Sequence, residues 1–332
     1  MVGRFDHSEW RNTLLLTADD AKNGTGVDRT GHTTLQEGLS RSIDSLAKKL
    51  NYHWSQKKVY LLDYKEDAAG QKKAATEDLL NVLNQGALMT TYFGHGSKTD
   101  WAAEGLLKPS YLSRISNTGR YTILNSFSCI VGRFDEGIKR SLSEEFVVAK
   151  SAGSIASVGA ARETFATNNE KFGKNFVFNL LRNDGITIGE AFMRAKNTNA
   201  EQLTSLNNAS LYRQRYNNEH YVLIGEPVIK ILSNGFKVTL DQKIDTLKAL
   251  DKVKLSGSVS GMDNGVIELS MRESRRNKNL FLGDPEHPED SLEVVYDGTL
   301  VYSEKVPVTG GRYETEFITP RKISFGDTAV EL

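Results

Sequence analysis

The sequence is short of three things: cysteine, net charge and long apolar runs. Only one of its 332 residues is a cysteine, which excludes a disulfide within the chain. Lysine plus arginine (42) equals aspartate plus glutamate (42), so no global field attracts nucleic acid or an anionic membrane. No apolar run approaches the roughly 18 residues of a membrane span, and the N-terminal region lacks the pattern of a secretory signal. We therefore expect no nucleic-acid partner and no membrane span in this chain.

Motifs of metal and phosphate chemistry are also missing. The six histidines are scattered, without His-Glu-x-x-His or Cys-x-x-Cys spacing, so metal-dependent hydrolysis is a weak alternative. The sequence contains no glycine-rich phosphate loop and no EF-hand pattern of acidic residues. We predict no metal at the catalytic centre and no obligatory cofactor.

From residue 11 to about 232 the chain alternates between strand-like and helix-like patterns. Apolar residues recur at three-four spacing between Leu35 and Leu50, for example, and the strand-like run at 59–62 follows. We predict strands at residues 13–17, 59–62, 87–93, 121–129, 153–158 and 221–232, and helices at 35–50, around 79–83, at 169–181 and at 186–196. Because crossover helices join such strands, the fold class is α/β with a largely parallel sheet flanked by helices.

Beyond Gly235 the pattern changes to short alternating runs separated by turn signals. Helical periodicity is lacking there, and short strands at such spacing are typical of an antiparallel sandwich. We therefore predict two domains, at residues 1–235 and 236–332. The chain stops at 328–332 without a turn or cap, so we expect the second domain to be truncated.

Two apolar runs end in residues that carry chemistry. The run at 87–93 stops just before His95, which glycines flank on both sides, and the run at 121–129 ends in Cys129. In open α/β sheets ligands bind beyond the carboxyl ends of the strands, so both side chains should face one crevice. A thiolate is a strong nucleophile, and a nearby imidazole can activate it and carry its proton. The pattern predicts a Cys-His enzyme of acyl transfer, most naturally a peptidase.

The glycines beside the imidazole bear on this prediction, because they let a substrate carbonyl approach the backbone. The N–H groups of Gly96 and Cys129 are then candidate donors to an oxyanion. Each motif also has a structural explanation: a cysteine after a strand is commonly a small buried hydrophobe, and Gly-His-Gly can be a tight turn. Their joint position on consecutive strand tips favours catalysis.

Four segments carry a family resemblance. They are residues 92–97 (YFGHGS) with Trp101, residues 128–135 (SCIVGRFD), residues 154–162 and residues 223–227 (LIGEP). Together they resemble the gingipain family of cysteine peptidases, and within it the sortases of the type IX secretion system. Residues 10–12, residues 18–20 and the region from Phe236 extend the resemblance over nearly the whole chain.

The resemblance implies a caspase-like (caspase-haemoglobinase) α/β domain followed by an immunoglobulin-like β-sandwich, with His95 and Cys129 as the catalytic dyad. In the family a carboxylate near the first strand supports the histidine. Asp20 is the preferred candidate for that role, ahead of Asp19. An orienting acid would hold the imidazole in a useful tautomer. The alternative is that both aspartates cap a turn.

The resemblance also implies substrates and a location. The substrate would be a protein or peptide, namely the C-terminal sorting domain of exported proteins, and the acceptor a surface lipopolysaccharide. Other type IX components would be partners, and the protein would be exported to the cell surface in association with the outer membrane. A structural calcium ion among loop carboxylates is compatible with the family.

Three residues near the motifs are candidates for a substrate pocket. Trp101 follows the histidine loop and is either a pocket wall or core packing. Glu104 and Arg162 either line the pocket or are solvated surface charges. Asp135 follows the cysteine closely, and we expect it to cap the next helix.

Two departures limit the resemblance. Family members have a subdomain before the segment that corresponds to residues 10–12, and we expect this chain to lack it. Asp28 is only loosely placed as the acid that selects a basic side chain in arginine-specific gingipains, so that specificity is not predicted. The leading function is a cysteine endopeptidase or transpeptidase. The alternative is a non-catalytic module of a surface or secretion complex that keeps the fold and binds partners.

Overall fold

The structure is a computed structural model, and it describes residues 9–20, 31–50, 52–182, 185–198, 209–231, 237–242, 248–282 and 290–321. Asp28, the predicted domain boundary near 235 and the chain end at 328–332 lie outside the described residues. The chain divides into two compact units, one formed by residues 10–231 with 279–294, the other by residues 1–9, 232–278 and 295–332. The predicted boundary stays a prediction.

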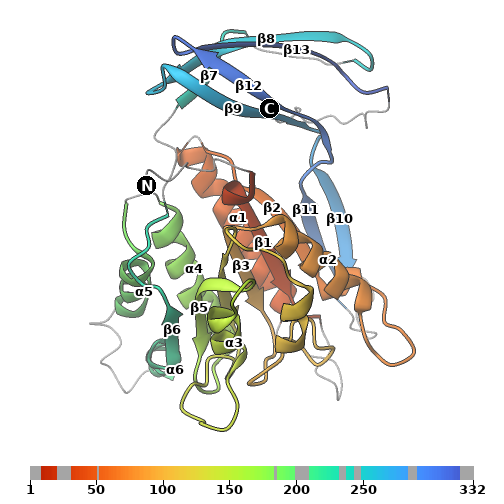
Figure 1. Ribbon diagram of the computed structural model, residues 1–332. Coiled ribbons are helices and arrows are strands. Elements are labelled where there is room, and N and C mark those ends of the chain that lie inside the picture. The colour runs from red at the N-terminus through yellow and green to blue at the C-terminus, as the bar shows by residue number, and fades with distance from the viewer. Residues whose placement is uncertain are drawn as a thin grey trace. The chain divides into compact units, whose positions relative to one another are not determined.

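A six-stranded sheet forms the centre of the first unit (Figure 1). Its spatial order is β2-β1-β3-β4-β5-β6; the first five strands run parallel, and β6 is antiparallel at one end. The strands are β1 (Thr13–Ala18), β2 (Ser55–Tyr60), β3 (Met89–Phe93), β4 (Thr122–Phe127), β5 (Ser154–Ala160) and β6 (Tyr221–Gly225). Every residue of β1, β3 and β4 is buried, as expected for strands covered on both faces. The predicted α/β class and largely parallel sheet are confirmed.

Helices cover both faces of this sheet. They are α1 (His32–Leu50), α2 (Lys73–Gln85), α3 (Leu142–Val148), α4 (Ala166–Leu181), α5 (Ile188–Asn197) and α6 (Ala209–His220), with 3₁₀ turns η1 (Glu9–Asn12), η2 (Leu61–Asp63) and η3 (Pro109–Arg114). Helices α2 and α3 share a core with Leu15 and Leu124 on one face. On the other face α4 places Phe172 against Phe127, with ring centroids 6.2 Å apart.

Helix α3 begins where its sequence encodes a capping box. The Ser141 side chain accepts a hydrogen bond from the Glu144 N–H, and the Glu144 carboxylate accepts one from the Ser141 N–H at 2.8 Å. The expectation that Asp135 caps this helix is wrong, because Ser141 does so. Helices α3 and α6 are absent from the sequence-based prediction, and the predicted last strand ends at Gly225 rather than 232.

The second unit is rich in antiparallel strands. Its five-stranded sheet has the order β7-β8-β13-β12-β9. A separate two-stranded sheet pairs β10 with β11, and its residues are divided between the units, since residues 279–294 belong to the first. The strands are β7 (Lys237–Leu240), β8 (Lys252–Ser260), β9 (Asn264–Arg272), β10 (Arg276–Phe281), β11 (Ser291–Tyr296), β12 (Leu300–Thr309) and β13 (Arg312–Ile318). The change to antiparallel strands after 235 is confirmed, whereas the immunoglobulin-like sandwich stays a prediction. Among the described residues, no helix has the length and apolar character needed to cross a membrane.

Candidate active site

Three neighbouring strands deliver an acid, an imidazole and a thiol to one edge of the sheet. Ala18 of β1 lies beside Phe93 of β3, which lies beside Phe127 of β4. Asp19 follows β1 directly, and His95 and Cys129 each come two residues after the paired phenylalanines. Adjacent strands are separated by about 4.8 Å, so the three residues are ordered along one edge. The prediction that parallel strands bring His95 and Cys129 to the same edge agrees with this register.

The glycines on both sides of His95 are required by close packing. A Cβ atom on Gly96 would lie 2.7 Å from the Ser128 Oγ and 2.9 Å from the Cys129 carbonyl oxygen. A Cβ atom on Gly94 would lie 2.1 Å from the Tyr92 Oη. At Gly96 the histidine loop therefore packs directly on the cysteine loop, whereas at Gly94 it is the Tyr92 and Asp19 side chains that leave no room for a Cβ atom.

Asp19 is the acid that contacts His95. Its Oδ2 accepts hydrogen bonds from the His95 N–H at 2.9 Å and from the Tyr92 hydroxyl at 3.2 Å, and that hydroxyl also contacts the His95 carbonyl at 2.6 Å. A carboxylate oxygen of Asp19 and ring nitrogens of His95 and His32 lie within 4.8 Å of one another. The rings of His32 and His95 meet edge to face with centroids 4.9 Å apart. Asp19 thus fixes the backbone that carries the imidazole.

Burial changes the titration of Asp19. The pKa of its carboxyl rises from 3.8 to about 7, because burial and then the nearby Glu104 and Asp20 carboxylates outweigh the His95 N–H bond. The folded protein therefore carries Asp19 partly protonated near neutral pH.

Asp20, the preferred orienting acid in the sequence, has another partner. Its Oδ2 lies 2.5 Å from the ammonium of Lys72, which also donates to the Leu61 carbonyl at 2.7 Å. Both side chains are buried. Because the carboxylate is paired in this way, Asp19 is better placed than Asp20 to support His95.

Glu104 completes a buried acidic cluster rather than lining an open pocket. Carboxylate oxygens of Asp19, Asp20 and Glu104 lie within 4.8 Å of one another, and burial raises the pKa of Glu104. Three carboxylates are a donor set that suits Ca²⁺. The Lys72 ammonium already supplies positive charge 2.5 Å from Asp20, however, so this cluster does not fit a calcium ion while Lys72 is in place. Calcium elsewhere stays a prediction.

The Cys129 side chain is half-buried and lies against Thr164, in the loop after β5. The Thr164 N–H donates to Sγ at 3.4 Å, and the Thr164 carbonyl and hydroxyl oxygens lie 3.7 and 3.8 Å from it. Ile130, the next residue, has φ of 47°, which is strained for a β-branched side chain. Such strain is typical of sites where the surrounding structure fixes one backbone geometry.

The N–H of Gly96 is one of the two predicted oxyanion donors, and it makes neither hydrogen bond of the backbone bridge that Gly96 forms. Gly96 forms an isolated antiparallel bridge with Trp101. The bridge consists of bonds from the Ala102 N–H to the His95 carbonyl at 3.0 Å and from the Ser97 N–H to the Asp100 carbonyl at 2.9 Å. The Gly96 N–H is not one of these donors, which is compatible with its predicted role.

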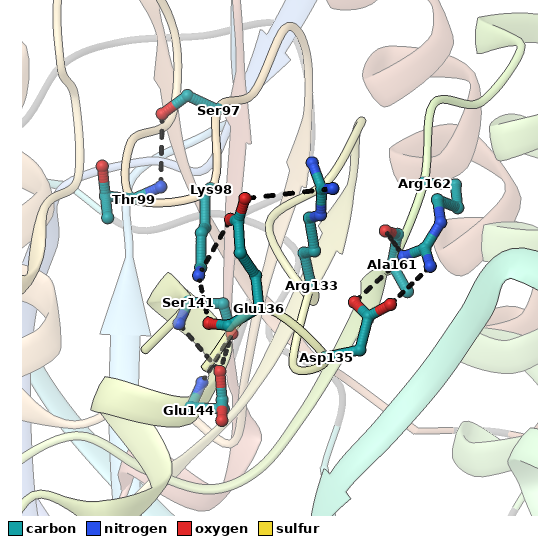
Figure 2. Close-up of polar contacts among 10 residues, drawn as sticks. All are labelled: Ser97, Lys98, Thr99, Arg133, Asp135, Glu136, Ser141, Glu144, Ala161 and Arg162. Carbon is teal, nitrogen blue, oxygen red and sulfur yellow. Dashed lines mark hydrogen bonds and ion pairs between the residues drawn. The ribbon is translucent and has the colours of Figure 1, made fainter. Parts of the chain in front are cut away.

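Two of the predicted pocket residues have other roles. Trp101 is fully buried, stacks on Tyr92 with ring centroids 4.5 Å apart and donates from Nε1 to the Ser126 Oγ. It packs in the core, so the pocket-wall alternative for Trp101 is wrong. Arg162 forms a two-pronged ion pair with Asp135 at 3.1 and 2.5 Å (Figure 2). Its guanidinium is thus engaged with the loop after Cys129.

Ion pairs tie that loop on two sides. The Glu136 carboxylate lies 3.1 Å from the Lys98 ammonium and 3.9 Å from the Arg133 guanidinium. Figure 2 shows these contacts beside the pair of Asp135 and Arg162. Lys98 comes from the loop after β3 and Arg162 from the loop after β5. The loop that follows the candidate nucleophile is therefore held by both of its neighbours, a function that the separate sequence motifs do not indicate.

Comparison with known proteins places the chain in a family. Residues 3–232 match the family described as Peptidase family C25. No curated protein matches the sequence significantly. The fold resembles the Arg-specific cysteine proteinase gingipain R (RgpB), with a TM-score of 0.52 and 13% identity over 95% of this chain and 62% of that one.

Two further structures show the same likeness. A complex of Porphyromonas gingivalis RgpB pro- and mature domains gives a TM-score of 0.52 at 13% identity, over 95% of this chain and 63% of that one. A structure described only as a protease gives 0.50 at 13% identity, over 94% and 68%. The chain thus spans less than two thirds of the RgpB chains, and identities this low show the fold alone. Because the family match covers most of its length, the chain belongs to Peptidase family C25, the gingipain family of cysteine peptidases.

Proposed function

We propose that the protein is a cysteine peptidase in which Cys129 is the nucleophile and His95 the general base and acid. One observation carries the proposal: Asp19, His95 and Cys129 follow three adjacent parallel strands, in that order, and the histidine and cysteine loops pack against each other. Nucleophilic catalysis needs the base next to the nucleophile and an orienting group behind the base.

The proposed reaction has two halves. The imidazole of His95 takes the thiol proton, and the Cys129 sulfur attacks the peptide carbonyl carbon, with the oxyanion stabilised by the N–H groups of Gly96 and Cys129. His95 then gives its proton to the leaving amine as the C–N bond breaks, leaving a thioester. Water or an amine attacks the thioester, His95 takes the proton of the attacking group, and the thiol is restored.

Asp19 supports His95 from behind. Its carboxylate accepts from the backbone N–H of His95, and one of its oxygens lies within 4.8 Å of a ring nitrogen, so it can orient the ring and stabilise the imidazolium. Asp20 remains the alternative candidate.

We further infer a sortase role like that of PorU, the sortase of the type IX secretion system. The motifs at 92–97, 128–135 and 223–227 support it. In this role the substrate is the C-terminal sorting signal of exported proteins, the acceptor an amine of surface lipopolysaccharide, and the enzyme works at the cell surface with other type IX components.

The test uses a synthetic peptide with a sorting-signal sequence and a second peptide of random sequence. The wild-type protein should cleave the first, and Cys129→Ala and His95→Ala should reduce cleavage by about a thousandfold or more. If an amine competes with water in attacking the thioester, an added primary amine should be incorporated into part of the product. Undiminished cleavage by Cys129→Ala would rule out the mechanism, and cleavage of both peptides alike would rule out the sortase role alone.

The alternative is a binding module without chemistry. Thiol alkylation separates the two, because a thiol paired with imidazole reacts with iodoacetamide in mildly acidic solution, where an isolated thiol is protonated and slow. Rapid reaction of Cys129 at pH 6 supports the peptidase. An ordinary rise of the rate towards alkaline pH supports the binding module.

A further inference from the structure

A buried asparagine lies behind the loop that contacts the candidate nucleophile. Asn217 of α6 is fully buried. Its Nδ2 donates to the Phe165 carbonyl at 2.9 Å, and its Oδ1 accepts from the Phe165 N–H at 2.9 Å. One side chain thus holds both backbone polar groups of the residue next to Thr164. Phe165 is the N-cap of α4 and makes no side-chain capping hydrogen bond of its own, and Asn217 supplies the acceptor for its N–H.

The same amide connects to the strand that carries Cys129. Asn217 Nδ2 also donates to the Asn169 Oδ1 at 2.7 Å, which accepts from the Tyr221 hydroxyl at 2.8 Å. Asn169 in turn donates from Nδ2 to the Phe127 carbonyl at 3.3 Å, two residues before Cys129. The network therefore joins the segment before the sulfur to the loop that touches it.

The other end of this network is the sulfur contact itself. The Thr164 N–H donates to the Cys129 Sγ at 3.4 Å, and the Thr164 hydroxyl lies 3.8 Å away. Both groups are positioned by the backbone that Asn217 holds one residue further on. The N–H donates to the sulfur and favours the thiolate, whereas the Thr164 carbonyl, 3.7 Å from the sulfur, accepts from the thiol. Loss of the N–H contact therefore disfavours the thiolate.

Stability alone does not call for this arrangement. Burying an amide costs free energy unless all its groups are bonded, and an apolar contact between helices avoids that cost. The polar contact of Asn217 instead fixes one geometry, since a buried network satisfies its hydrogen bonds in a single arrangement.

We propose that Asn217 is a positioning residue for Cys129: by holding Phe165 and Asn169 it keeps the Thr164 N–H and hydroxyl against the sulfur. The proposal rests on the proposed function in taking Cys129 as the nucleophile. It adds a residue from α6, far along the chain, to the machinery that prepares the thiol.

The chain contains a matched control at the opposite edge of the sheet. Asn117 is buried, accepts from the Gly153 N–H at 2.9 Å and donates to the Gly153 carbonyl at 2.8 Å. It makes the same two-bond contact as Asn217, just before β4 and β5 begin, away from their carboxyl ends. Loss of either side chain should therefore cost similar stability, but only one lies behind the thiol.

The experiment measures the rate of Cys129 alkylation by iodoacetamide from pH 5.5 to 9.5 in the full chain. Asn217→Ala should lower the rate at pH 6 by about tenfold, the effect of weakening one hydrogen bond to a charged group, and approach the wild-type rate at pH 9.5. Asn117→Ala should keep the wild-type pH profile, although both variants should melt at a lower temperature than the wild-type protein. Equal profiles for Asn217→Ala and the wild-type protein would overturn the proposal.

A second pair of variants covers the case in which Asn217→Ala does not fold. Thr164→Val removes the hydroxyl near Sγ and should lower the alkylation rate at pH 6. Thr164→Ser keeps the hydroxyl and should react at the wild-type rate. A wild-type rate in Thr164→Val would overturn the proposal. If the wild-type protein itself reacts only at alkaline pH, the proposed function fails, and that outcome is distinct from a failure of the role of Asn217 alone.

Discussion

Asp19 links the stability of the fold to pH. The pKa of its carboxyl is about 7 in the folded protein and 3.8 in the unfolded chain. Between these values the folded protein keeps a proton that the unfolded chain has lost, so stability falls as pH rises, by at most about 1.4 kcal/mol per unit. Asp19→Asn removes this contribution. Urea denaturation at pH 5 and pH 8 should show a smaller loss of stability in the variant, and an equal loss in both proteins would contradict the assignment.

The same residue should control activity in the opposite direction. A carboxylate orients and stabilises the His95 imidazolium better than a carboxylic acid does, so kcat/KM should rise as pH increases through about 7. Asp19→Asn keeps the acceptor for the His95 N–H but loses the charge, and should lower kcat/KM by about tenfold or more. Kinetics across pH 5 to 9 test this, with Asp20→Asn as the comparison. A larger loss in Asp20→Asn would return the role to Asp20.

The packing of Gly96 predicts a separate effect. Gly96→Ala places a methyl group 2.9 Å from the backbone oxygen of Cys129, so one of the two loops must shift. We expect peptidase activity to fall by about a hundredfold, as for a misplacement of about 1 Å. Gly137→Ala is the control, because nothing lies within 4 Å of its added methyl. Equal activity of the two variants would show that the close contact has no catalytic consequence.

At the scale of elements, the capping box of α3 predicts a loss of stability without loss of chemistry. Ser141→Ala removes the side chain that bonds to Glu144 and should cost about 1 kcal/mol in urea denaturation. Ser110→Ala, at an exposed position of η3, should cost nothing measurable. Because α3 covers the sheet rather than presenting a catalytic side chain, kcat should stay near the wild-type value in both variants. A large drop in kcat for Ser141→Ala would mean that the helix acts on the site.

The sequence predicts those elements whose hydrophobic pattern is strong. The parallel strands are buried on both faces and therefore read as apolar runs, so their tips, with His95 and Cys129, are found without coordinates. Helix α6 is not found, because it contacts its neighbours through amides such as Asn217 and Asn218 and carries no apolar stripe.

The choice between Asp19 and Asp20 shows a second limit of prediction from the sequence. Successive residues at the end of a strand point to opposite faces of the sheet, so a shift of one position exchanges the two carboxylates. Which one meets His95 depends on Lys72, 52 residues away, which pairs with Asp20. The Thr164 contact has no motif at all, since it is made by the backbone and one hydroxyl of an irregular loop.

At the scale of the whole molecule, the first unit includes a segment from beyond the predicted domain boundary. Residues 279–294 cluster with residues 10–231, and the Arg41 guanidinium donates to the Glu293 carbonyl at 2.7 Å. A chain cut after residue 235 lacks this segment. We expect it to keep the six-stranded sheet but to melt several degrees below the full chain in a thermal unfolding experiment. An unchanged melting temperature would show that the segment contributes nothing to the unit.

The lone thiol has a further chemical consequence. A cysteine oxidised to the sulfenic acid is commonly rescued by a second cysteine, which condenses with it to a disulfide that reductants reopen. These 332 residues contain no second cysteine, so a sulfenic acid on the half-buried Cys129 cannot condense to a disulfide within them.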